Sequence, residues 1–252
     1  MRGDENTKKL EIAAFLANIA QETGAKVVDD PFGSPGCAIQ EGYGAEAAWH
    51  DCAFGERPGE TVSLWGCNKT RPFECPKAPD PRLCPGKEVG YFGRGPHQLT
   101  HDVNYKAFGE TMGVGDKYLN DPDLLTTNPE IGIAGSIWFW GHEEVTQWSP
   151  PDIPFKPSAH NVVVGKWKPT NSSTPGVGAS NDVKCGRTEA NFGVIINLIN
   201  GGVECGPGAL NPEAAKNRVE YLKAIAKEMG VDIPDGFLDN CSTQENFNCP
   251  SY

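Results

Sequence analysis

The sequence predicts a mainly α-helical fold of the α+β class, combined with a long region of loops. Two observations support this prediction. Four segments repeat apolar residues at the helical period, whereas the stretch between Asp30 and Cys84 is rich in Gly, Pro and Cys and has no sustained period. No internal repeat and no linker divides the 252 residues. We therefore expect one domain whose long loop region is held by disulfides and carries function.

The first two helices are predicted from their apolar residues and their end signals. One runs from about residue 5 to residue 23, and Gly24 follows as its terminator. Its apolar stripe is formed by Ile12, Phe15, Leu16 and Ile19. The other covers residues 129–140, with Asn128 as its N-cap and a proline at its first position. Because this helix is apolar on nearly every side, we expect it to be buried.

Two further helices are predicted in the C-terminal third of the chain. Residues 191–200 are mostly apolar, and residues 211–230 open with Asn-Pro and close at a glycine. The inward-facing side chains of the latter are Val219, Leu222, Ile225, Ala226 and Met229. A shorter helix is expected after Thr100.

Charge and hydropathy limit the possible partners. The formal net charge of −11 argues against nucleic acid and anionic membranes, because Lys and Arg must supply contacts to phosphate. The same charge is compatible with a neutral glycan. No apolar run approaches the roughly 18 residues of a membrane-spanning helix, so we expect no membrane partner.

The cysteines indicate an oxidising compartment. Nine cysteines without a CxxC pair favour disulfides over a zinc ribbon or a thioredoxin-type site. Together with N-glycosylation sequons at Asn68, Asn171 and Asn240, they favour a secreted, extracellular protein. The first ten residues, MRGDENTKKL, lack the apolar region of a signal peptide, so we expect that a signal was removed or that the chain is a fragment.

Glu22 is the first candidate for chemistry. It lies at the edge of the apolar stripe of the first helix and in its last turn, where the helix dipole is negative. Both desolvation and the dipole disfavour a carboxylate, so we expect a raised pKa for this group. A carboxylic acid with a raised pKa can protonate a glycosidic oxygen. The alternative, from the pattern alone, is an ordinary surface glutamate.

Glu56 is the second candidate. It lies in a loop between Gly55 and Arg57, where a carboxylate should stay ionised at neutral pH and could activate a water. Inverting glycosidases need such a carboxylate across the sugar from the acid, with about 6.5–9.5 Å between the two groups to leave room for the water. The alternative is a solvated loop residue.

Residues 90–100, GYFGRGPHQLT, join aromatic rings, glycines and hydrogen-bonding side chains that could line a sugar cleft. The alternative is a tight turn packed beneath a helix. His97 and His101 are four residues apart, but neither an HExxH pattern nor a third ligand accompanies them, so we expect no metal and no cofactor. The tryptophans that could serve as sugar platforms, or instead as core or loop anchors, are Trp49, Trp65 and Trp167.

Six blocks of the sequence carry a family resemblance. They are LEIAAFLAN with QETG (10–24), WHDCAFGE (49–56), YFGRGP with QLTH (91–101), IGIAGSIWFW (131–140), NLINGGVECG (197–206) and LDNC (238–241). In this order they resemble the motifs of the family 19 glycoside hydrolases, the lysozyme-like chitinases of plants and bacteria. The resemblance covers nearly the whole chain.

The resemblance implies a lysozyme-like fold with two lobes around a substrate cleft. It also implies endo-acting, inverting hydrolysis of β-1,4-linked N-acetylglucosamine polymers. Glu22 would be the general acid, Glu56 the general base, and Thr100 would help to hold the attacking water. Glu204 and Arg218 would form a charged network near the acid. The implied sugar-binding residues are Trp49, Tyr91, Gln98, Asn104 and Asn200.

The implied organisation is one chitinase-like catalytic domain over residues 1–252, with a peripheral tail from about residue 242. Its partners would be chitin or chito-oligosaccharides, and we expect a monomer. The family disulfides that the resemblance implies are Cys75–Cys84 and Cys205–Cys241. A helix and a cysteine that usually precede the first block are missing, which leaves Cys52 without its usual partner. The cysteines whose pairing stays open are therefore Cys37, Cys52, Cys67, Cys185 and Cys249.

Two alternatives to a chitinase stay open. A peptidoglycan hydrolase is one, since a lysozyme-like cleft accepts other N-acetylated glycans. A chitin-binding protein without turnover is the other, because Gln21 replaces the histidine that commonly precedes the acid and Val103 replaces a cleft tyrosine. Both carboxylates and Thr100 are present, which favours the enzyme.

Overall fold

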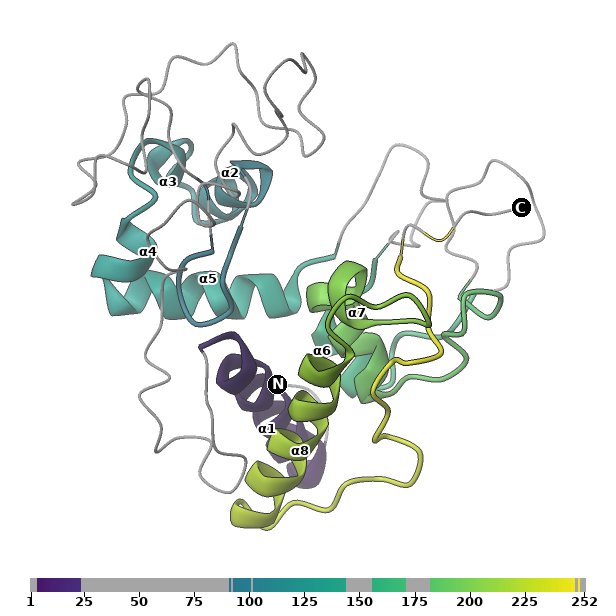
Figure 1. The fold of residues 1–252 in the computed structure, drawn as a ribbon. Helices are drawn as coiled ribbons and strands as arrows, with labels where there is room; N and C mark the ends of the chain where they lie inside the picture. Colours follow the sequence, from purple (N-terminus) through teal and green to yellow (C-terminus); the bar gives the residue numbers. More distant parts are fainter. Residues whose placement is uncertain are drawn as a thin grey trace. The chain divides into compact units, whose positions relative to one another are not determined.

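The structure is a computed structural model, and it describes residues 4–23, 91, 93–100, 102–143, 156–170, 182–247 and 249 (Figure 1). The chain divides into unit 1 (Met1–Gln21, Ala25–Ser34 and Trp140–Tyr252) and unit 2 (Glu22–Gly24 and Pro35–Phe139). Among the described residues the regular elements are helices, α1 to α8, together with one isolated bridge between Arg94 and Leu99. The predicted mainly helical fold is confirmed.

Helix α1 (Glu5–Glu22) matches the first predicted helix. It begins directly after Asp4, whose carboxylate accepts a hydrogen bond from the Thr7 backbone N–H at 2.7 Å. This hydrogen bond lowers the pKa of Asp4. The buried face differs from the prediction, because most of its buried residues are alanines, among them Ala13, Ala14 and Ala17, whereas the four residues of the predicted stripe are half-buried. Small side chains let neighbouring helices approach this face closely.

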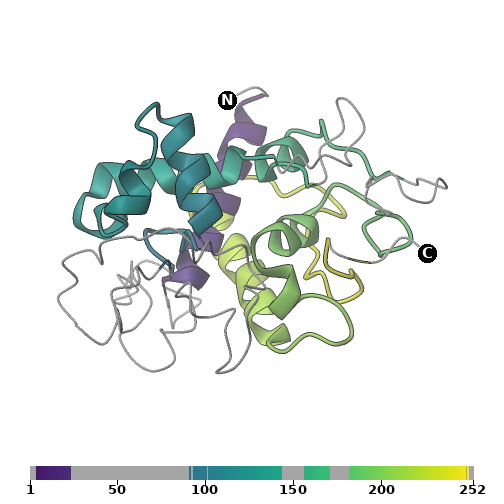
Figure 2. The same cartoon turned by 90° about the horizontal axis from the view of Figure 1, so that it is seen from above.

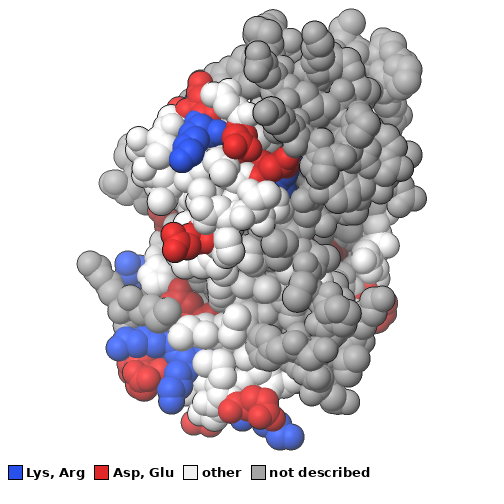
Figure 3. Space-filling view, turned by 90° about the vertical axis from the view of Figure 1, so that its left-hand side faces the viewer, with Lys and Arg blue, Asp and Glu red and all other residues white. Residues whose placement is uncertain are grey.

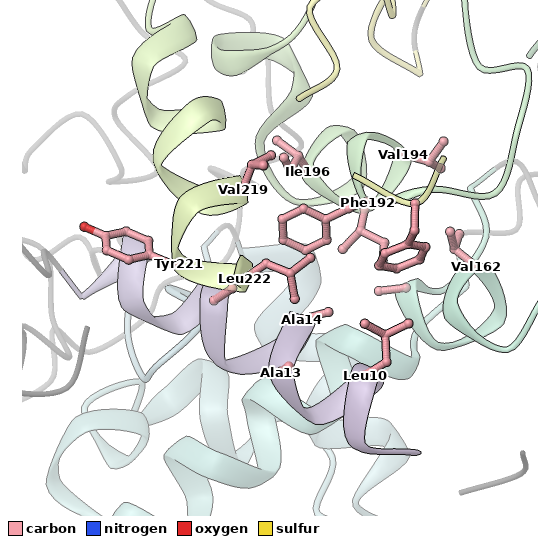
Figure 4. Packing of buried hydrophobic residues seen from close by; sticks show 14 of the residues in the cluster. Leu10, Ala13, Ala14, Val162, Phe192, Val194, Ile196, Val219, Tyr221 and Leu222 are labelled. Atoms are coloured by element: carbon pink, nitrogen blue, oxygen red, sulfur yellow. The ribbon is translucent and has the colours of Figure 1, made fainter. Parts of the chain in front are cut away.

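Unit 1 also contains α6 (Ala159–Val163), α7 (Phe192–Glu204) and α8 (Pro212–Glu228). Helix α7 packs against both α6 and α8, and α7 and α8 lie side by side in the two ribbon views (Figure 2). In Figure 4, side chains of α1 such as Leu10 and Ala14 lie in one apolar cluster with Phe192 of α7 and Leu222 of α8. The side chains of Ser158, Asn191 and Asn211 cap α6, α7 and α8 by accepting a backbone N–H.

Unit 2 contains α2 (Asp102–Thr111), α3 (Lys117–Asn120), α4 (Leu124–Thr127) and most of α5 (Pro129–Gly141). Its core consists of Tyr91, Leu99, Tyr105, Phe108, Tyr118, Leu119 and Leu125. The helices α2, α5, α7 and α8 agree with the predicted segments. Helices α3, α4 and α6 were not predicted, because four or five residues are too few to show a helical period.

The prediction that residues 129–140 are buried all round is wrong. Ile133 and Ile137, one turn apart, are 44% and 59% exposed. The opposite face is built from small residues, and a Cβ at Gly132 would come 2.5 Å from the carbonyl oxygen of Leu125. The buried face of α5 therefore packs through its backbone at Gly132, and not through the large apolar side chains that the pattern suggested.

The C-terminal tail is not peripheral in its described part. Gln244 and Phe247 are buried at 1% and 3% exposure. A disulfide joins Cys185 to Cys249, and a second joins Cys205 to Cys241, the pairing that the resemblance implies. Cys75 and Cys84 lie outside the described residues.

The described charges are mixed on the surface. On the face that Figure 3 shows, acidic and basic side chains are interleaved. On α8, Lys216 pairs with Glu213 and Lys223 pairs with Glu220 along the exposed side. In the described part of the chain, no helix is long and apolar enough to cross a membrane.

Candidate functional site

Glu22 is the last residue of α1, and its side chain is half-buried. The last turn of α1 contains no basic residue, so no cation of the helix itself offsets the negative end of the dipole there. Glu56 and Trp49 lie outside the described residues. Their roles stay predictions.

A buried polar network includes Asn18, which lies one turn before Glu22 along α1. The guanidinium of Arg218 on α8 donates to both oxygens of Glu204 on α7, at 2.8 and 2.7 Å. Its third nitrogen donates to the Asn18 side-chain oxygen on α1 at 2.9 Å. Exposure is 1% for Arg218, 2% for Glu204 and 0% for Asn18. Because a bidentate Arg–carboxylate pair has fixed geometry, the network fixes α1, the helix that carries Glu22, against α7 and α8.

Asn18 was not singled out in the sequence. Its amide donates to the Ala14 carbonyl at 2.8 Å and presents its oxygen to Arg218. A polar residue among the alanines of a buried helix face needs a hydrogen-bond partner. The position of Asn18 beside these alanines in the sequence could therefore have indicated a buried polar contact.

Helix α7 bends at Asn200, whose φ and ψ of −145° and 35° are not helical. The Asn200 amide donates to Glu204 Oε1 at 2.9 Å, so Asn200 joins the network described above. The structure thus brings together Asn200, Glu204 and Arg218 within unit 1. Asn200 itself is half-buried, so part of its side chain is accessible.

In unit 2, a tight turn and the start of α2 contain three further residues for which a role in the site was predicted. Residues 94 and 99 exchange backbone hydrogen bonds at 3.2 and 2.9 Å, and Gln98 has a positive φ of 50°. The side chain of Gln98 donates to the Gly95 carbonyl at 2.8 Å, and the Thr100 hydroxyl donates to the Gln98 carbonyl at 2.7 Å. Asn104, in the first turn of α2, donates to the Thr100 carbonyl at 2.8 Å. The three side chains are half-buried and follow one another along a chain of local hydrogen bonds.

The buried side chain of Arg94, the first residue of this turn, anchors it to neighbouring residues. It is 2% exposed, and its Nε and Nη2 lie 2.9 and 2.8 Å from one oxygen of Asp123. Its Nη1 donates to the Tyr105 hydroxyl at 3.1 Å.

The sugar-binding role predicted for Tyr91 is not supported. Tyr91 is 0% exposed, its ring packs against Tyr105 with centroids 5.4 Å apart, and its hydroxyl donates to the Leu119 carbonyl at 3.0 Å. Aromatic residues serve cores as well as clefts, and the sequence did not separate the two uses.

The structure also describes other candidates. Trp167 is half-buried against the unit 1 core. Val103 is 51% exposed, and His97 is buried, while His101 lies outside the described residues. Among the residues that the structure describes, no cluster could hold a metal ion. A cavity of about 510 Å³ opens near Thr7 and Phe237 in unit 1, and none of the described site residues lines it.

Comparisons with known proteins identify the family of the chain. The sequence model of the family described as glycoside hydrolase 19, chitinase class I, matches residues 1–240. An endochitinase of Pisum sativum is 36% identical over 245 residues, which cover 97% of this chain and 61% of that protein. Chitinase 9 of Oryza sativa is 32% identical over 249 residues, covering 98% and 59%. The chain therefore spans about 60% of the length of these curated relatives.

Solved structures share the fold. Chitinase C from Streptomyces griseus superposes with a TM-score of 0.55 at 23% identity, covering 98% of this chain and 80% of that one. The class IV chitinase of family 19 from Zea mays gives 0.52 at 22% identity, covering 94% and 77%. The match over residues 1–240 shows that the chain belongs to family 19 of the glycoside hydrolases, the class I chitinase family.

Proposed function

We propose that this chain is an endo-acting chitinase that hydrolyses β-1,4 linkages between N-acetylglucosamine units with inversion. Family membership over residues 1–240 and relatives named endochitinases support the reaction class. The single observation that carries the proposal is the position of Glu22 at the end of α1, one helical turn after Asn18, whose side chain is held by Arg218 and through it by Glu204.

In this proposal Glu22 protonates the leaving oxygen and Glu56 activates a water on the opposite face of the sugar. The bond between the anomeric carbon and the leaving oxygen breaks as the water oxygen bonds to that carbon, and the water proton passes to Glu56. Gln98, Asn104 and Asn200, with Trp49, bind the sugar chain.

Thr100 suits the role of holding the water. Its hydroxyl proton is already given to the Gln98 carbonyl at 2.7 Å, so the lone pairs of its oxygen are the groups that face a ligand. A water that donates one proton to Thr100 and the other to Glu56 would have its own lone pair directed away from both. That lone pair is the nucleophile.

Glu22→Gln tests the proposal, because it removes the transferable proton with almost no change in volume. We expect turnover of chitin hexamer to fall about 10²–10⁴-fold while calorimetry still shows oligosaccharide binding. Glu5→Gln is the matched control: it makes the same change at the exposed start of the same helix, and it should keep wild-type activity. Equal turnover in Glu22→Gln and the control would overturn the assignment.

Substrate class and stereochemistry need two further measurements. Proton NMR of the first product should show the α-anomer, and an initial β-anomer would contradict inversion. Parallel assays on colloidal chitin and on bacterial cell walls separate a chitinase from a peptidoglycan hydrolase, and oligosaccharide binding without any shorter products would establish a binding protein. The names of the relatives favour chitin.

We also propose that the protein is secreted and works as a monomer on chitin, without nucleic acid or membrane partners. Two disulfides among the described residues support an oxidising compartment. Free-thiol titration of protein from its native source should find few of the nine cysteines reduced. A titration that finds nearly all of them reduced would refute secretion.

A further inference from the structure

The bond between Cys185 and Cys249 closes the C-terminal segment onto the loop that precedes α7. We call residues 241–247 and 249 the strap. The backbone N–H of Glu245 donates to the Cys185 carbonyl at 2.8 Å. Arg187, which is 0% exposed, donates to the carbonyls of Glu245 and Asn246 at 2.5 and 3.2 Å. The disulfide is therefore one part of a continuous buried attachment.

A second strap contact is made from α7 itself. The Asn197 amide donates to the Glu245 carbonyl at 2.9 Å and lies 3.4 Å from the Gln244 side-chain oxygen. Gln244 in turn donates to Asp239 at 3.1 Å and to the α7 N-cap Asn191 at 3.4 Å. The strap thus holds α7 both at its N-cap and at Asn197.

Asn197 and Gly201 lie before and after the bend in α7. The side-chain oxygen of Asn197 is placed against Gly201, where any Cβ would overlap it. Asn200, between these two residues, is the one with the non-helical φ and ψ. The orientation of the Asn197 amide therefore requires a glycine at position 201, directly after the bend. The strap fixes that orientation through the Glu245 carbonyl.

We propose that the strap is a positioning device for sugar binding, because through Asn197 it sets the bend that directs Asn200. Asn197 and the strap residues are positioning residues, which act through Asn200. The inference rests on the proposed function, in which Asn200 binds the sugar. It gives a role to Cys185 and Cys249, whose pairing the sequence left open.

Asn197→Asp is the sharpest test, because it keeps the shape and removes the donor to the Glu245 carbonyl. We expect the KM for chitin hexamer to rise roughly three- to tenfold, the range of one lost hydrogen bond, with kcat within about twofold. The matched control is Asn6→Asp, which removes an amide donor to the Asp232 carbonyl at the start of α1. It should leave KM and kcat unchanged.

A double-mutant cycle then shows whether the effect passes through Asn200. If it does, Asn197→Asp should raise KM little further once Asn200→Ala is present, whereas a general structural effect would multiply with it. If Asn197→Asp does not fold, the pair Cys185→Ala and Cys249→Ala takes its place, with the same expected rise in KM. Wild-type hydrolysis with an unchanged KM in these variants, or multiplicative effects, would overturn the strap alone. A wild type that neither binds nor cleaves the hexamer would overturn the proposed function, and this inference with it.

Discussion

Each unit contains a buried arginine beside its candidate site residues, and the two arginines are paired differently. Arg218 in unit 1 meets both oxygens of Glu204, which is itself 2% exposed, and reaches Asn18 on a third helix. Arg94 in unit 2 meets a single oxygen of Asp123, whose side chain is 16% exposed. The Arg218–Glu204 pair itself spans 14 positions, but the hydrogen bond from Arg218 to Asn18 spans 200. The Arg94–Asp123 pair spans 29. The difference indicates that Arg218 joins three helices through a fully buried pair, while Arg94 joins one turn to α2 and to the N-cap residue of α4 through a partly exposed pair.

The largest effect should follow Arg218→Met. The free energy of unfolding should fall by about 3–5 kcal/mol, because the Glu204 carboxylate would stay buried without a counter-charge. Urea unfolding measures the loss. Adding Glu204→Met should restore much of the stability but no chitin hydrolysis, since an apolar pair packs without orienting Asn18 or Asn200. A loss below about 1 kcal/mol in the single variant would contradict the buried-network interpretation.

Arg94→Met should cost less, about 1.5–3 kcal/mol in the same assay. Water can reach Asp123, so the carboxylate left behind is partly solvated, and the main loss is the set of hydrogen bonds to Asp123 and Tyr105. If Arg94→Met proved as costly as Arg218→Met, the contrast between the two units would be wrong.

Thr100→Val separates chemistry from stability. Loss of the bond to the Gln98 carbonyl should cost about 0.5–1.5 kcal/mol of unfolding free energy. Thr126→Val removes a similar local bond, to the Asp123 carbonyl, and should cost about as much. Turnover of chitin hexamer should fall only in Thr100→Val. Equal turnover in the two variants would remove Thr100 from the proposed mechanism.

The smallest effect concerns Asp4, an exposed charge against which the two buried pairs can be compared. Its pKa is lowered by the hydrogen bond from the Thr7 N–H, so the carboxylate stabilises the fold above the ordinary pKa of an aspartate. This contribution should be lost as the pH falls through the lowered pKa. The stability difference between wild type and Asp4→Asn, measured by thermal unfolding, should therefore shrink below about pH 4. A difference that widens as the pH falls would contradict the assignment.

The same contrast between local and distant contacts explains what the sequence could predict. The long helices follow from period and end signals, and Gln98, Thr100 and Asn104 come together because their hydrogen bonds span at most four residues. Asn18 escaped prediction because its partner lies 200 residues away. The burial of Tyr91 could not be predicted, because an aromatic residue in a glycine-rich segment suits either a cleft or a core. The exposed Ile133 and Ile137 show that a helix packed closely through its glycines can leave large apolar side chains exposed, although its apolar pattern predicts burial.

The alanine face of α1 has a consequence for engineering the protein. Ala13, Ala14 and Ala17 have no exposed surface, so even one added methyl group would have to displace a neighbouring helix. That displacement would move α1, and Glu22 is carried at the end of the same helix. Ile12 and Ile19 are only half-buried and have room to vary. In a saturation library, the alanine positions 13, 14 and 17 should therefore be less replaceable than the isoleucine positions 12 and 19.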